Sequence, residues 1–320
     1  MAVAKGAAIV VDVDAQAVAE PPWGARWGVS GGSMLLHRSG SGDVPVVWLA
    51  GGGMFGLYYW NVHRLAAQFT TSVVYDRLGT GWSDPAEPPR SSTKVTDDLR
   101  ELLDLAGVAR PCVLVGHSLG GLYARHFAKR FPDDVAGLVL ADPTHEDVVD
   151  YLPPEAAQRL TSWTSDIALP PEQIDAMRTT YRTVFATALA QWPEKVRKPL
   201  LDRAFQPEVY ERSLREPMDL TSVFDEVRAA GPDPGLPMIL LCAMGSDAFT
   251  DELLTPDLRA AAARSAQAKH RCFTEAVAST PRAELRRIDD AGHSGLIWQH
   301  PEVVLRAVRD VITAATSRRR

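Results

Sequence analysis

Short apolar runs alternate with stretches of helical spacing along most of the 320-residue chain. The apolar runs predict strands at residues 33–37, 44–49, 71–75, 111–115, 135–140, 237–241 and 284–288. The helical stretches between them lie at residues 61–68, 95–106, 119–130, 255–278 and 301–314. Strands that alternate with helices are typical of a mainly parallel sheet with helices on both faces, so the pattern predicts an α/β fold.

The alternation stops between about residues 145 and 236, where apolar residues recur at helical spacing and prolines divide the segment. This change predicts three parts: a first core segment (1–144), a helical insertion (145–235) and a second core segment (236–320). The insertion is rich in aromatic residues: Tyr151, Trp163, Tyr181, Phe185, Trp192, Phe205, Tyr210 and Phe224. Two interpretations apply to them: packing within the insertion, or lining an apolar pocket above the core.

A Gly-x-Ser-x-Gly pentapeptide lies between a predicted strand and a predicted helix, with Gly116, Ser118 and Gly120 as its fixed positions. A sharp turn from strand to helix would hold Ser118 in a strained conformation, and small neighbours would let strand and helix approach closely. The hydroxyl would then project above the sheet beside the first N–H groups of the helix. The alternative is a glycine-rich turn whose serine only caps the helix.

A serine hydroxyl needs a base within hydrogen-bond reach to become a nucleophile. His293 follows the last predicted strand and would lie at the carboxyl end of the sheet, where Ser118 also lies. The base in turn needs a carboxylate, and Asp247 follows a predicted strand and gives the order Ser118, Asp247, His293. Asp142 is the alternative acid, since it also ends a strand, and Asp251 lies four residues beyond Asp247.

An oxyanion formed from a carbonyl substrate needs two N–H donors. Leu119 follows Ser118 and would supply the first of them. The second is expected from the glycine-rich segment after the predicted strand 44–49, where Gly52 is the preferred donor and Gly53 the alternative.

Composition narrows the possible partners. A net charge of −6 and a pI near 5.8 give no electrostatic reason to expect nucleic acid or an anionic membrane. The three cysteines (Cys112, Cys242 and Cys272) form no disulfide framework, and the N-terminus has no signal-peptide pattern, so a cytoplasmic protein is expected. The glycine at Gly79 starts no dinucleotide or phosphate motif and no cysteine–histidine spacing fits zinc, so neither a cofactor nor a metal is expected.

Together these motifs resemble the α/β-hydrolase superfamily, and in particular its capped group, which includes proline iminopeptidases, esterases and epoxide-hydrolase-like enzymes. Residues 75–84 resemble that group's Asp-Arg-x-Gly-x-Gly-x-Ser turn, residues 135–143 its strand ending in Asp-Pro, and Gly292-His293 with Pro301 its C-terminal motif. The resemblance implies an α/β-hydrolase fold with a mostly parallel eight-stranded sheet and an inserted helical cap. Ala50 stands where the group usually has histidine.

These residues predict a serine hydrolase that cleaves an ester, thioester or lactone, and less readily an amide, of a medium-sized hydrophobic small molecule. A serine nucleophile disfavours dehalogenase and epoxide hydrolase chemistry, which the resemblance ties to aspartate. Two alternatives remain: an acyltransferase, cyclase, lyase or C–C hydrolase with the same residues, and a hydrolase-like ligand-binding protein with little turnover.

Overall fold

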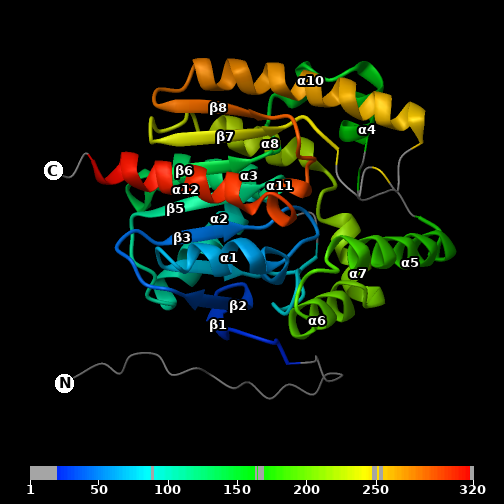
Figure 1. The fold of residues 1–320 in the computed structure, drawn as a ribbon, viewed down its shortest axis with the longest axis horizontal. Coiled ribbons are helices and arrows are strands. Elements are labelled where there is room, and N and C mark those ends of the chain that lie inside the picture. Colours follow the sequence, from blue (N-terminus) through cyan, green and yellow to red (C-terminus); the bar gives the residue numbers. More distant parts are fainter. Residues whose placement is uncertain are drawn as a thin grey trace.

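The computed structural model describes residues 20–87, 90–162, 164, 169–246, 251 and 255–317. Within them an eight-stranded sheet has the order β1-β2-β4-β3-β5-β6-β7-β8 (Figure 1). Its strands are β1 (Ala25–Val29), β2 (Gly32–Ser39), β3 (Val46–Leu49), β4 (Ser72–Tyr75), β5 (Cys112–His117), β6 (Val135–Ala141), β7 (Met238–Ala243) and β8 (Ala283–Ile288). The pairs from β4 to β8 are parallel, and β1–β2 and β2–β4 are antiparallel. The predicted mostly parallel, eight-stranded sheet is therefore confirmed.

Helices cover both faces of the sheet because successive strand residues point to opposite sides. In β3, Val46 and Trp48 face one hydrophobic core, whereas Val47 and Leu49 face the other. The first core is closed by α1 (Trp60–Ala66), α11 (Gly295–Trp298) and α12 (Pro301–Thr316). The second is closed by α2 (Ser92–Leu105), α3 (Leu119–Arg130) and α10 (Pro256–Ala278).

Every strand and helix predicted from the apolar pattern has a counterpart, with differences at the ends. The helix predicted from residue 95 begins at Ser92, because the hydroxyl of Ser91 accepts a hydrogen bond from the Lys94 N–H at 3.1 Å and caps the helix there. The sequence left open whether residues 1–27 form an outer strand. Residues 25–29 do form the edge strand β1, whereas residues 1–19 lie outside the described residues.

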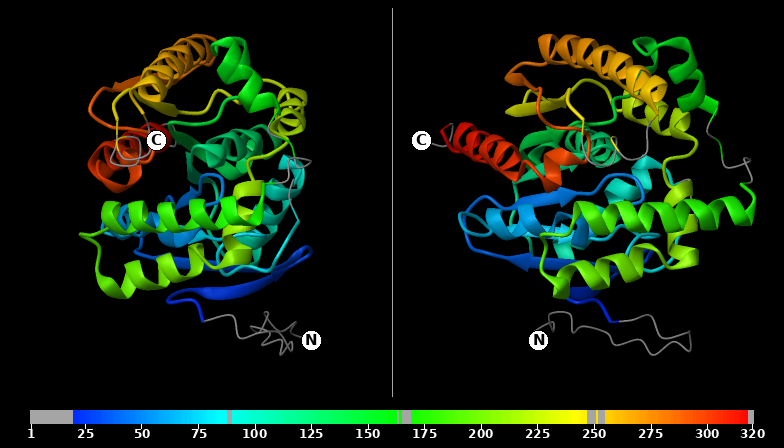
Figure 2. Two further views of the ribbon diagram at one scale, coloured as in Figure 1. Left: turned by 90° about the vertical axis from the view of Figure 1, so that its right-hand side faces the viewer. Right: turned by 45° about the vertical axis from the view of Figure 1, so that its right-hand side comes forward.

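A helical insertion between β6 and β7 stands at the carboxyl end of the sheet (Figures 1 and 2). Its helices are α4 (Pro154–Ser162), α5 (Pro171–Ala188), α6 (Glu194–Ala204), α7 (Pro207–Arg215) and α8 (Leu220–Ala229). Proline opens three of them at the first helical position, where its missing N–H costs no hydrogen bond. Helices α5, α6 and α7 pack on one another, while α8 returns to the core and packs on α2 and α3. The predicted boundaries at residues 145 and 235 stay a prediction.

Buried aromatic rings join the insertion to the core. Phe185 of α5 packs against Tyr58, from the short 3-10 helix η1 (Gly56–Tyr59), and against Trp298, with ring centroids 5.4 and 5.2 Å apart. Phe205 continues the cluster 5.6 Å from Phe185. The interpretation that the aromatics pack a core applies to these two residues, whereas Trp163 lies outside the described residues.

In the parts of the chain that the structure describes, every helix is too short or too polar to traverse a bilayer.

Candidate active site

Ser118 lies at the sharp turn between β5 and α3. Its backbone angles are φ 54° and ψ −125°, a conformation that residues with a Cβ rarely adopt. The turn is held at both sides, because the Ser118 N–H donates to the Ala141 carbonyl at 3.2 Å and the Ser118 carbonyl accepts from Thr144 N–H at 2.9 Å. Ser118 is half-buried, at the start of α3, where the first N–H groups of the helix have no acceptor within the helix.

The two glycines of the pentapeptide are required by this close packing. A Cβ at Gly116 would overlap the backbone of Gly120, and a Cβ at Gly120 would overlap the carbonyl oxygen of Leu49. Because neither glycine has a Cβ, α3 can start against the end of β3. This places Ser118 beside the glycine-rich segment that follows β3.

His293 is paired with Asp142. The Nδ1 atom of His293 lies 2.6 Å from Oδ2 of Asp142, whose side chain is fully buried at the end of β6. Oδ1 of the same carboxylate accepts the Ala243 N–H at 2.9 Å, which fixes its plane. Because Asp142 uses Nδ1, the Nε2 atom of His293 is the one left to take up a proton.

The other two acid candidates are Asp247 and Asp251. Asp247 lies outside the described residues. Asp251 is exposed, and its carboxylate accepts a hydrogen bond from the Ser246 hydroxyl at 3.3 Å. Among the described residues, the acid paired with His293 is therefore Asp142, the alternative that the sequence offered.

A second cation contacts Asp142. The ammonium group of Lys269 from α10 lies 2.5 Å from Oδ2, the same oxygen that faces His293. Burial by itself raises the pKa of Asp142, but the charge of Lys269 and the hydrogen bond from His293 outweigh burial and hold this pKa below its usual value. The carboxylate is thus ionised and able to stabilise a charged imidazole.

A buried hydrogen-bond chain connects the His293 loop to the glycine-rich loop. His117 donates from Nε2 to the His293 carbonyl at 3.0 Å and accepts at Nδ1 from the Tyr59 hydroxyl at 2.8 Å. The Tyr59 oxygen in turn accepts the Gly51 N–H at 2.9 Å. Burial lowers the pKa of His117 to about 3, so the ring stays neutral and keeps this donor and acceptor pattern.

The glycine-rich loop lies directly against Ser118. A Cβ built on Gly51 would be 3.2 Å from the Ser118 Cβ. The Gly53 N–H is occupied, because it donates to Oε2 of Glu216 at 2.5 Å. Among the described residues nothing accepts from the N–H of Gly52, which is half-buried, so Gly52 has an N–H available for a substrate oxygen.

Two charged side chains hold the glycine-rich loop in place: Arg77 of the core and Glu216 of the insertion. The Arg77 guanidinium donates to the carbonyls of Ala50 and Gly51 at 2.6 and 2.8 Å. It also forms a two-pronged ion pair with Glu216, at 2.8 and 3.0 Å. Glu216 follows α7, so one carboxylate from the insertion binds both the arginine and the loop that carries Gly52.

A cavity of about 480 Å³ opens beside His293. Its wall includes Lys269 and Arg259 of α10, with apolar side chains such as Leu152 and Met244. A small organic molecule with one polar group would fit such a lining.

Residues 35–307 match the alpha/beta hydrolase family. The chain belongs to the alpha/beta hydrolase family. The predicted resemblance is therefore confirmed at the level of the family.

Solved structures of other hydrolases share the fold of this family member. A thermophilic esterase from Thermogutta terrifontis is 20% identical, with a TM-score of 0.56 over 88% of this chain and 94% of that one. A meta-cleavage product hydrolase from Pseudomonas fluorescens IP01 is 18% identical, with a TM-score of 0.59 over 92% and 99%. A structure described as an ancestral haloalkane dehalogenase is 19% identical, with a TM-score of 0.60 over 91% and 99%. At these identities the likeness shows the fold alone.

Curated relatives match this hydrolase-family chain over shorter segments. The abhydrolase domain-containing protein abhd-5.2 of Caenorhabditis elegans is 36% identical over 124 residues, which is 37% of this chain and 27% of that protein. The uncharacterized protein YbdG of Bacillus subtilis is 27% identical over 144 residues, or 44% and 39%. The chain spans less than half the length of each of these relatives.

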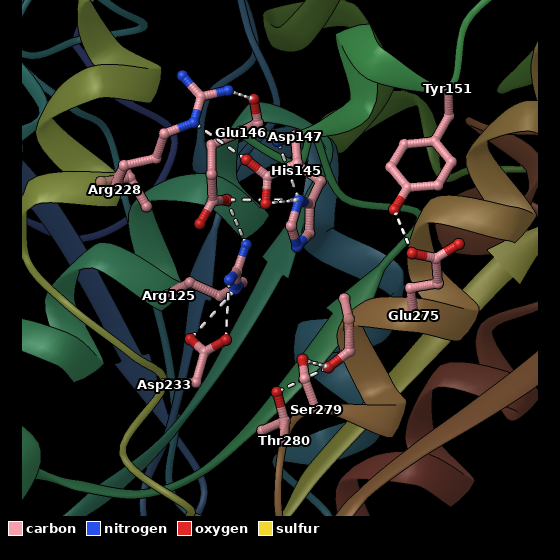
Figure 3. A network of polar contacts seen from close by, with 12 residues as sticks. Arg125, His145, Glu146, Asp147, Tyr151, Arg228, Asp233, Glu275, Ser279 and Thr280 are labelled. Carbon is pink, nitrogen blue, oxygen red and sulfur yellow. Dashed lines mark hydrogen bonds and ion pairs between the residues drawn. The ribbon is translucent and has the colours of Figure 1, made fainter.

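A separate group of acidic and imidazole side chains in the hydrolase fold has metal-binding residue types: His145, Glu146 and Asp147 (Figure 3). The Glu146 carboxylate, however, already bonds two cations, the Arg125 guanidinium and the Lys129 ammonium, the latter at 3.2 Å. The group is accordingly part of an ion-pair network that fixes α3 to the loop after β6.

Sequence reasoning did not find several groups that surround Ser118 in this hydrolase fold. Tyr59 and Glu216 lie in no motif, and their roles depend on contacts across 58 and 163 residues of sequence. Arg77 lies within the Asp-Arg turn that carries the family resemblance, and His117 within the pentapeptide, so a signal was present for both.

Proposed function

We propose that the protein is a serine hydrolase that cleaves an ester, thioester or lactone of a medium-sized hydrophobic small molecule. The observation that carries the proposal is the strained Ser118 at the start of α3, whose neighbour His117 donates a hydrogen bond to the carbonyl of His293, the partner of Asp142. A serine, an imidazole and an ionised carboxylate supply the three groups that acyl transfer needs.

In the proposed reaction the Ser118 oxygen attacks the substrate carbonyl while Nε2 of His293 takes its proton. The charge of Asp142 stabilises the imidazolium that results. The carbonyl oxygen becomes an oxyanion, which the N–H groups of Leu119 and Gly52 stabilise. The intermediate collapses to an acyl-enzyme, and His293 returns the proton to the departing alcohol or thiol. Water, deprotonated by His293, then releases the acid and restores Ser118.

Asp142 takes the acid role in this proposal because of its contact with His293. The preference for Gly52 over Gly53 as second oxyanion donor is supported by the bond that Glu216 makes with the Gly53 N–H.

Labelling with a fluorescent fluorophosphonate tests the nucleophile, since the reagent reacts with activated serines. We expect the wild type to be labelled and Ser118→Ala to lose all labelling. The control is Ser246, an exposed serine that lines the cavity beside His293, and Ser246→Ala should be labelled like the wild type. Hydrolysis of p-nitrophenyl esters from acetate to laurate should reach a maximum at one chain length. A folded wild-type protein that takes no label at Ser118 would overturn the proposal.

The ion pair between Glu216 and Arg77 should matter for both rate and stability. In Glu216→Gln the buried Arg77, whose side chain is 2% exposed, loses its charged partner. We expect kcat for a p-nitrophenyl ester to fall about 100-fold, because the loop that carries Gly52 loses a fixed position. The free energy of unfolding should fall by about 3 kcal/mol, because breaking a buried pair leaves an uncompensated charge.

Glu211→Gln is the matched control for this variant. Glu211 pairs with Arg215 on the surface of α7, and both side chains are more than two-fifths exposed. Its loss should change neither kcat nor the unfolding midpoint measurably. An unchanged kcat in a folded Glu216→Gln protein would mean that this pair does not position the loop.

A further inference from the structure

Lys269 is a cation that the proposed reaction leaves without a role. It lies on α10, 127 residues from Asp142 along the chain, and its side chain is 21% exposed. Its ammonium group approaches Oδ2 of Asp142 at 2.5 Å, and His293 approaches that same oxygen at 2.6 Å. Since Oδ1 accepts the Ala243 N–H, a single carboxylate oxygen serves both the lysine and the imidazole.

Sharing one oxygen has an electrostatic consequence. The carboxylate stabilises the protonated imidazole by its negative charge, and an ammonium on the same oxygen offsets part of that charge. The ammonium also repels the imidazolium directly. Asp142 is fully buried, whereas the side chains of Lys269 and His293 are 21% and 47% exposed, so water weakens the direct repulsion more than the sharing of the buried oxygen. An ammonium on this oxygen therefore works against the stabilisation that the carboxylate gives to an imidazolium.

In the part of the chain that the structure describes, the other charged groups near His293 do not offset the ammonium. The ring of His117 lies 4.7 Å away but remains neutral. Arg259 and Asp251 line the same cavity as opposite charges. On the His293 loop, Asp289 is paired with Arg287 at 2.7 Å and Asp290 is exposed. Among these groups Lys269 is the one that contacts the carboxylate of Asp142.

We propose that Lys269 is a positioning residue that fixes the Asp142 carboxylate and lowers the pH at which His293 becomes a competent base. The inference rests on the proposed function, because it assigns Lys269 to the same Asp142–His293 pair. It predicts that the hydrolase keeps its activity at a lower pH than a pair without the lysine would allow.

The test is the pH dependence of kcat/KM for a p-nitrophenyl ester in Lys269→Met, which keeps an unbranched side chain one atom shorter and removes its charge. We expect the acid limb of the profile to move up by about one pH unit, with KM and the plateau rate changed less than about threefold. Lys269→Arg restores a cation and should return the limb towards its wild-type position. Arg259→Met, which removes a cation from the same helix and cavity without touching Asp142, should move the limb much less.

An unchanged acid limb in a folded Lys269→Met protein would overturn the inference. So would a rise in KM without a shift of the limb, because Lys269 would then bind substrate instead. If Lys269→Met does not fold, Lys269→Gln takes its place.

A second measurement keeps this test separate from the proposed function. The titration of the His293 ring, followed by NMR and assigned with His293→Gln, should show the same upward shift in Lys269→Met. If Ser118 takes no fluorophosphonate label but this titration shifts, the proposed function fails and the effect of Lys269 on His293 stands. If the titration does not move, the inference fails whatever the labelling shows.

Discussion

Replacing Asp142 with asparagine is expected to lower kcat/KM for a p-nitrophenyl ester by about four orders of magnitude. An amide keeps an oxygen for the Ala243 N–H but carries no charge to stabilise the imidazolium of His293. An amide nitrogen turned towards His293 would also favour the wrong tautomer of the ring. Steady-state kinetics, with circular dichroism to verify the fold, measure the effect.

Asp247→Asn and Asp251→Asn are the matched controls, because the sequence favours Asp247 as the acid, with Asp142 as the alternative and Asp251 four residues beyond Asp247. With Asp142 as the acid, both variants should keep kcat/KM within about threefold of the wild type. A loss of about four orders of magnitude in Asp247→Asn, with Asp142→Asn nearly as active as the wild type, would transfer the acid role to Asp247.

Acidification is expected to destabilise the protein between about pH 6.5 and pH 4, a range in which buried histidines, including His63, His117 and His145, resist protonation. Burial lowers the pKa of His63 and His117 to about 3 and that of His145 to about 4. In the unfolded chain histidines bind protons near pH 6.5. The unfolded state therefore binds more protons in this range, and the free energy of unfolding falls as the pH falls.

One buried carboxyl acts in the opposite direction. Burial raises the pKa of Asp76 to about 6, so the folded protein takes up this proton before the unfolded chain does and gains stability below that pH. Each group that differs between the two states contributes about 1.4 kcal/mol per pH unit. With one of the three histidines offset, the expected slope is on the order of 2 to 3 kcal/mol per pH unit.

Urea unfolding at half-unit steps from pH 7 to pH 4.5 measures this slope. His63→Gln should reduce it, because the substitution removes one of the buried groups that titrate only in the unfolded chain. The His63 ring is buried and hydrogen-bonded to the Ser39 and Ser72 hydroxyls. His270→Gln, at a half-exposed position on α10, serves as the control. A stability that stays constant over this range would contradict the buried, neutral state of these histidines.

The fold could be predicted from the sequence because buried strands and helices show characteristic patterns of apolar residues. Strands buried on both faces, such as β5 and β6, appear as continuous apolar runs. The edge strand β1 left no such trace, because four of its five residues are exposed or half-exposed and its position depends on pairing with β2. Helix ends depend on caps, such as the Ser91 hydroxyl at the start of α2, that the apolar pattern places only approximately.

The site could be predicted only in part, for a different physical reason. Ser118 and His293 follow from local motifs, but the acid does not, since Asp142 and Asp247 both follow neighbouring parallel strands, β6 and β7. Either strand end can reach a histidine on the loop after β8, so the choice depends on side-chain geometry that one sequence does not encode. Lys269 and Glu216 belong to ordinary charged helical segments, and only the folded arrangement brings them to Asp142 and the glycine-rich loop.

The bond from Glu216 to the Gly53 N–H has a consequence for how the insertion can be altered. Exchanging the segment between β6 and β7 for that of another family member would be an obvious way to change which molecules the protein accepts. Any such graft that lacks a carboxylate at this point would leave Arg77 with no anion and the loop beside Ser118 with no anchor. We therefore expect substrate preference and turnover to change together in such a graft unless it brings its own acidic residue to the position of Glu216.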